Sequence, residues 1–237
     1  MNGVLTLLSF GPAGWGDEIA LGVLVTISLA LVTLPFGLAA GFTVALAKTS
    51  EEPSLRLAAN IYTTIFRGLP ELLTLFLVFY GAQIAVQQIT RVLGANATIE
   101  INAFVAGIVA LGAVFSAYAS EVFVSAFRAI PRGQYEGAYA VGLSRRRTMQ
   151  LVILPQLIRL ALPGLSNLWL ILLKETSLVS VIGLADILRQ TGIAARVSKE
   201  AFLFFGIACL LYLGLSVLSS FAFSAIERRV SSSGPSR

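Results

Sequence analysis

Histidine is missing from this chain of 237 residues, and cysteine occurs once, as Cys209. Without histidine the chain has no Ser-His-Asp triad, no His-ligated zinc or haem, and no general base of the commonest kind at neutral pH. A single cysteine can form neither an internal disulfide nor a cysteine-rich metal site. We therefore expect no catalytic residues, no metal site and no cofactor in the chain itself.

Charge is also scarce. Charged residues make up 12% of the chain and hydrophobic residues 57%, with a mean hydropathy of +0.86. Soluble domains carry about 25% charged residues, so this composition indicates an integral membrane protein. The net charge of +5 would suit nucleic acid, but basic residues in so apolar a chain are typical of cytoplasmic loops, and we expect no nucleic-acid partner.

Five runs are apolar enough to cross a bilayer as helices, which predicts an all-α fold. The predicted spans are about 19–47, 58–86, 101–127, 151–173 and 201–226. Pro35 predicts a kink in the first span, and Gly37 and Gly41 predict a close helix contact. The second span contains the polar stretch 67–71, which is anomalous inside a bilayer.

Most of the 17 lysine and arginine residues lie on the side that holds the loop 128–150 and the C-terminus. Cytoplasmic segments collect these residues, so both segments are predicted to face the cytoplasm and the N-terminus to face outward. This orientation agrees with five crossings. Residues 1–237 then form one membrane domain, and the tail 230–237 is predicted to be disordered.

The cytoplasmic loop carries a long spaced pattern, because residues 129–155 read AIPRGQYEGAYAVGLSRRRTMQLVILP. The stretch resembles the signature of permease subunits of bacterial ABC importers: Glu-Ala-Ala, three residues, Gly, nine residues, Ile, one residue, Leu-Pro. The positions that match are Glu136, Ala138, Gly142, Leu154 and Pro155. Gly137 and Val152 depart from it conservatively. A generic amphipathic helix with a basic face rarely reproduces so long a pattern.

In permeases with this signature the loop docks on an ATP-binding subunit. Small side chains would let a partner surface approach closely, and Gly142 would allow a turn between two short helices. Glu136 could cap the loop or pair within it, and the three arginines could meet acidic groups or lipid phosphates. The predicted coupling residues are Glu136, Gly137, Ala138, Gly142, Arg145, Arg146 and Arg147.

Further motifs are similar to permeases that import polar amino acids, namely those for histidine, arginine, lysine, ornithine or opines. They are FRGLPE at 66–71, AYASE at 117–121, FRAIPRGQ at 127–134, ALPGLSN at 161–167 and LKETSLVS at 173–180. The resemblance covers nearly the whole chain. It implies a type I importer permease fold with cytoplasmic coupling helices, as a multi-pass protein of the bacterial cytoplasmic (inner) membrane.

The resemblance also implies partners. They are a second permease chain, identical or homologous, two ATP-binding cassette subunits and an extracytoplasmic solute-binding protein. ATP and magnesium would sit on the ATP-binding subunits, since this chain has neither GxxxxGK[ST] nor GxGxxG. The chain itself is therefore not expected to be an enzyme.

Two carboxylates, Glu71 and Glu121, lie deepest in the predicted spans. A charge inside a bilayer costs about 2.5–3.5 kcal/mol on insertion scales, so each should be paired or face a polar path. Together they would favour a cationic substrate group in one cavity. The structural alternative is pairing along the chain, of Glu71 with Arg67 and of Glu121 with Arg128.

Other polar residues could line the same path. They are Ser116, Tyr118, Asn167, Lys174 and Thr176. The predicted function is the permease subunit of an ATP-driven importer that moves amino acids, with cationic ones favoured. The alternatives are an ion-coupled secondary transporter or channel, an importer of neutral polar amino acids, and a membrane scaffold or sensor.

Overall fold

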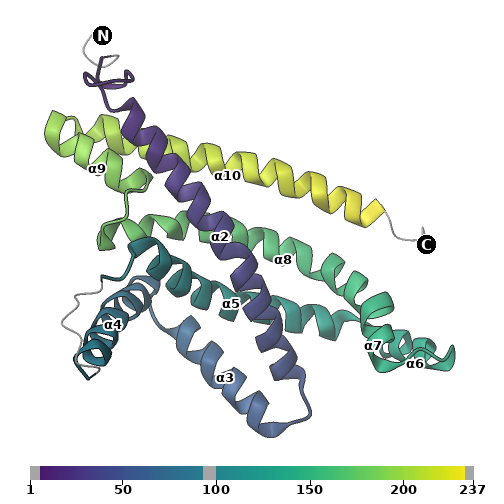
Figure 1. Cartoon of the computed structure of the whole chain (residues 1–237). Coiled ribbons are helices and arrows are strands. Elements are labelled where there is room, and N and C mark those ends of the chain that lie inside the picture. Colours follow the sequence, from purple (N-terminus) through teal and green to yellow (C-terminus); the bar gives the residue numbers. More distant parts are fainter. Residues whose placement is uncertain (1–5, 93–99, 233–237) are drawn as a thin grey trace.

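The computed structural model describes residues 6–92 and 100–232, and all the regular structure in these ranges is helical (Figure 1). The helices are α2 (Gly16–Thr49), α3 (Pro53–Gly68), α4 (Glu71–Val92), α5 (Ala103–Ala129), α6 (Arg132–Ala140), α7 (Arg145–Thr148), the π-helical η1 (Met149–Ile153), α8 (Leu154–Glu175), the 3-10 helix η2 (Thr176–Ile182), α9 (Ile187–Ser198) and α10 (Ala201–Ser232).

Five helical segments of the described residues are long and apolar enough to cross a membrane, which confirms the predicted all-α fold with five spans. They are α2, α4, α5, the continuous run Arg145–Ile182 and Ala201–Val230 within α10. Helix α2 begins at the opposite end of the molecule from the end of α10 (Figure 1). The short helices α6 and α7 lie on the same side of the molecule as the end of α10, as expected for the cytoplasmic side.

The second predicted span, 58–86, is wrong as a single helix. It is divided into α3 and α4, because Leu69 adopts an extended backbone with φ −91° and ψ 142°. Pro70 follows it, and proline disfavours helical backbone in the residue before it and donates no backbone hydrogen bond. The two helices meet at an angle (Figure 1). The anomalous polar stretch is therefore a helix break.

Helix α5 is the core of the fold, with most of its residues buried and α2 packed along it. Glycines allow this close approach. A Cβ added at Gly37 would lie 2.5 Å from Phe115 Cδ1, and one added at Gly41 would lie 2.9 Å from Ala119 Cβ and from the Ser116 carbonyl oxygen. The predicted close contact at these two glycines is confirmed.

Helix α9 is held against α2 and α10 by a buried carboxylate. Asp186 caps the helix by accepting a hydrogen bond from the Arg189 amide at 2.9 Å, and the Tyr212 hydroxyl donates to it at 3.4 Å. Thr26 Oγ1 on α2 accepts from the Ile187 amide at 3.3 Å. Burial raises the pKa of Asp186 to about 6, since desolvation outweighs these hydrogen bonds.

The last span continues further than predicted, because α10 is helical through Ser232. The prediction of a disordered tail is therefore wrong for residues 230–232. Residues 233–237 lie outside the described residues. An uninterrupted helix is consistent with the absence of glycine and proline between 215 and 232.

Replacing Gly41 with leucine is expected to destabilise the permease, because the new side chain would meet the α5 backbone. Overpacking of this kind costs about 1–3 kcal/mol. The measurement is the melting temperature of the purified membrane complex. Gly81→Leu on α4 is the matched control, since no atom lies within 4 Å of a Cβ added there. Equal melting temperatures for the two variants would contradict the packing assignment.

Candidate coupling segment and intramembrane charges

The predicted coupling segment forms two short helices joined by a turn at Gly142. Gly142 has φ +81°, a left-handed backbone that favours glycine. Its amide donates to the Tyr139 carbonyl at 2.9 Å, and the Leu143 amide donates to the Ala138 carbonyl at 3.1 Å. The Ser144 hydroxyl accepts from the Arg147 amide and caps α7. The turn that the sequence predicted at Gly142 is therefore present.

Most of the predicted coupling residues are exposed. They are Glu136, Gly137, Gly142, Arg145, Arg146 and Arg147. Ala138 differs, because it is only 6% exposed, on α6 where that helix packs against η1. It contributes to the packing of the segment and not to its outer surface. The exposed set comprises two glycines, one carboxylate and three guanidinium groups.

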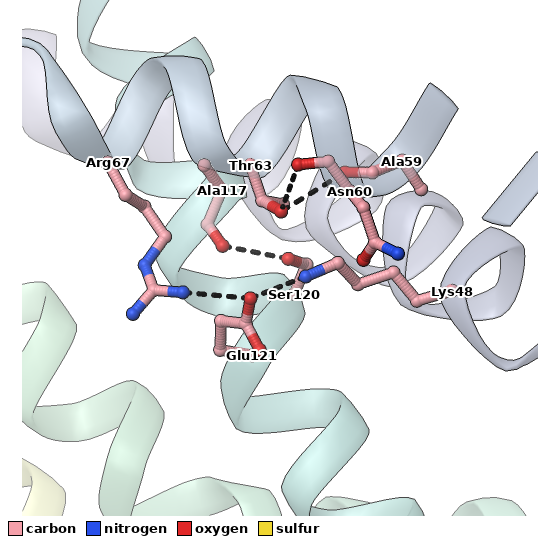
Figure 2. Close-up of polar contacts among 8 residues, drawn as sticks. All are labelled: Lys48, Ala59, Asn60, Thr63, Arg67, Ala117, Ser120 and Glu121. Carbon is pink, nitrogen blue, oxygen red and sulfur yellow. Dashed lines mark hydrogen bonds and ion pairs between the residues drawn. The ribbon is translucent and has the colours of Figure 1, made fainter. Parts of the chain in front are cut away.

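Glu121 joins the ends of two other helices to α5 (Figure 2). Lys48 Nζ, at the end of α2, lies 2.5 Å from Glu121 Oε1. Arg67 Nη1, at the end of α3, lies 2.9 Å from the same oxygen. The Arg67 guanidinium also lies over the Tyr118 ring, with Cζ 5.5 Å from the ring centroid. We call Lys48, Arg67 and Glu121 the charge triad.

Neither predicted pairing along the chain describes this arrangement. Arg67 pairs with Glu121, 54 residues away, and not with Glu71. The break at Leu69 and Pro70 separates Arg67 and Glu71 into different helices, so the i, i+4 geometry of one helix does not apply. Lys48 is not among the predicted site residues, and only its place at the end of the first apolar run hinted at a role.

Two of the predicted path residues, Ser116 and Tyr118, lie on α5, and Tyr118 contacts the triad through Arg67. The Ser116 hydroxyl is fully buried, donates to the Ala113 carbonyl at 2.8 Å and lies 2.7 Å from the Tyr62 hydroxyl. These contacts tie α3 to α5, so Ser116 is a packing residue. Tyr118 is partly exposed and lies against the Arg67 guanidinium. Tyr62 is a further polar residue that the sequence did not mark.

Lys174 and Thr176 lie at the end of α8, and Asn167 lies about two turns earlier in the same helix. Glu71 is the first residue of α4 and Glu175 the last residue of α8, and α4 packs against η2, which continues directly from Glu175. Glu71 and the cation Lys174 both act electrostatically on Glu175, in opposite directions. Thr176 is fully buried and donates to the Leu173 carbonyl at 2.7 Å, as a helix-end cap does. Lys174 and Asn167 are exposed. Glu71 and Glu121 thus belong to different clusters.

These features match a known family. Residues 34–232 match the family described as binding-protein-dependent transport system inner membrane component. The chain belongs to this family. It is 42% identical to the nopaline transport system permease protein NocQ of Agrobacterium fabrum over 94% of this chain and 95% of that protein. It is 38% identical to the histidine/lysine/arginine/ornithine transport system permease protein HisQ of Salmonella typhimurium over 92% and 95%.

Solved structures agree. An amino acid ABC transporter solved with histidines superposes with a TM-score of 0.77 at 32% identity, covering 91% of this chain and 95% of that one. The MetNI methionine ABC transporter, in an inward-facing form, superposes with a TM-score of 0.71 at 19% identity and supports the fold alone. The chain thus has the type I ABC importer permease fold. Family membership sets aside the ion-coupled transporter and the scaffold.

Loss of the central carboxylate of the triad is expected to destabilise the permease. Glu121→Gln would leave Lys48 and Arg67 facing each other, and the one-third exposure of Glu121 moderates the cost to about 1–3 kcal/mol. The measurement is the melting temperature of the complex at low and high salt. Glu51→Gln, on the exposed turn after α2, is the matched control. Adding Lys48→Gln to Glu121→Gln should recover part of the loss. A Glu121→Gln complex as stable as the control would contradict the triad.

Proposed function

We propose that this chain is the membrane-spanning subunit of an ATP-driven importer for amino acids or opines with a cationic group. Four relatives, at 33–42% identity over most of the chain, are named for nopaline, for octopine (two of them) or for histidine, lysine, arginine and ornithine. The observation that supports the charge preference is the pair of carboxylates, Glu71 and Glu175, at the break in the second crossing.

The carboxylate pair suits a cation for a physical reason. Two like charges close together in a bilayer repel, and each also loses hydration. A guanidinium, ammonium or imidazolium group between them would relieve both penalties. Glu121 is less suited to this role, because the triad already supplies it with two cations. We therefore infer that the cation-selecting charge lies at Glu71 and Glu175. Lys174 precedes Glu175 in the chain and offsets part of this negative charge, which leaves about one carboxylate for the substrate cation.

The partners follow from the family and from the exposed coupling segment. An importer permease works with ATP-binding subunits and an extracytoplasmic binding protein. We infer two ATP-binding subunits and a second permease chain, each permease contributing one coupling segment. The exposed arginines of α7 and the glycine turn suit an acidic groove on the ATP-binding subunit. ATP hydrolysis there would drive alternating access of the path.

Gly142→Val is expected to uncouple ATP hydrolysis from uptake. A β-branched residue is strongly disfavoured at φ +81°, so the turn between α6 and α7 would change shape. Uptake in proteoliposomes should fall about tenfold or more while ATPase activity persists. Gly133→Ala, in α6 with open space around it, is the control. Wild-type uptake by Gly142→Val would count against docking at this turn.

Glu71→Gln is expected to change substrate preference. Removing the charge should lower uptake of arginine about tenfold while leaving uptake of glutamine nearly unchanged, since glutamine carries no side-chain charge. The measurement is competitive uptake of the two labelled amino acids into proteoliposomes that contain the whole importer. Glu52→Gln, exposed before α3, serves as control. An unchanged arginine-to-glutamine ratio would remove the charge-selection proposal and favour a neutral amino acid.

A further inference from the structure

The charge triad carries more positive charge than structural pairing requires. Lys48 and Arg67 both bind Oε1 of Glu121, so the three groups together carry one net positive charge. One base would neutralise one carboxylate. The second base leaves a positive charge at the ends of α2 and α3 that an anionic group from outside this chain would neutralise.

The two bases differ in the exposed fraction of their side chains. The Lys48 side chain is 11% exposed, whereas the Arg67 side chain is 44% exposed. Arg67 uses one nitrogen, Nη1, on Glu121, and Figure 2 shows its second terminal nitrogen directed away from that carboxylate. A guanidinium has five donors and can hold a carboxylate through two parallel hydrogen bonds. Arg67 is therefore the base available to an incoming anion.

The surroundings of Arg67 identify the class of anion. Arg67 lies in the last turn of α3, and Glu71 begins α4 directly after the break. A molecule with a carboxylate at one end and a cation at the other fits this order of charges. Every amino acid substrate of the proposed function has the carboxylate. The Tyr118 ring lies under the guanidinium and gives it a favourable surface when it turns from Glu121.

We propose that Arg67 exchanges Glu121 for the α-carboxylate of the transported amino acid, and that Lys48 remains on Glu121 as its counter-charge. Without Lys48, the release of Arg67 would leave a carboxylate unpaired in the bilayer, a costly state. With Lys48 in place, Glu121 keeps a counter-charge while Arg67 binds the α-carboxylate of the substrate. The proposal rests on the proposed function, because it requires an amino acid in the path.

The test is direct binding to the purified membrane complex in the absence of the binding protein, with arginine and agmatine as probes. Agmatine is arginine without its carboxylate. The wild-type complex should bind arginine at least about tenfold more tightly than agmatine. Arg67→Gln should weaken arginine binding about tenfold and leave agmatine binding unchanged. Arg56→Gln, on the same helix, is the matched control and should behave as wild type.

A double variant separates this role from simple pairing. If Arg67 served only to pair with Glu121, Arg67→Gln combined with Glu121→Gln would restore arginine binding, which would overturn the proposal. We expect the double variant to stay weak and Glu121→Gln alone to keep its preference for arginine. Arg67→Lys covers the case in which Arg67→Gln fails to assemble. It keeps the charge but loses the bidentate geometry, so unchanged arginine binding would again overturn the proposal.

The outcomes distinguish this inference from the proposed function. Glutamine and 4-aminobutanamide, its counterpart without the carboxylate, form a second probe pair that does not depend on a cationic side chain. If the wild-type complex binds neither amino acid, the proposed function fails. Suppose instead that the wild-type complex binds arginine or glutamine, and that the Arg67→Gln complex prefers that amino acid over its decarboxylated counterpart as strongly as the wild type does. The exchange at Arg67 then fails and the proposed function stands.

Discussion

Pairing of charge inside a low-dielectric medium is the constraint on which this structure depends. Glu121 lies in the central helix α5, and its carboxylate is supplied with two bases from the ends of α2 and α3. The triad joins the end of α3 to α5, and the break at Leu69 and Pro70 ends α3 and lets α4 begin at Glu71.

The remaining architecture connects the cytoplasmic surface to those charges. Helix α7 continues through η1 into α8 and η2 as one helical run from Arg145 to Ile182. One end of this run begins in the exposed coupling segment, and Glu175 lies near its other end. Under the proposed function, this run connects the Gly142 turn to the region of Glu175. Helices α2 and α5 pack closely through Gly37 and Gly41, and α8 packs against α5.

Much of the fold could be predicted from local features. Apolar runs set the five spans, and the glycine pair at 37 and 41 predicted the contact between α2 and α5. Gly142 predicted the turn in the coupling segment, because few other residues adopt a positive φ. The break at Pro70 was not predicted, because the apolar residues on both sides favoured one helix. The prediction of a disordered tail was wrong at residues 230–232, because their polar composition gave no sign that α10 continues there.

The pairing of the intramembrane charges could not be predicted in this way. Arg67 is four residues from Glu71 and 54 from Glu121, yet it binds Glu121. Lys48 lies 73 residues from Glu121 and binds it too. Composition, hydropathy and motif spacing by themselves determined the membrane class, the number of spans and the coupling segment, because each is a property of neighbouring residues. Only the tertiary structure decided which acid meets which base, because that depends on how helices distant in the chain lie against one another.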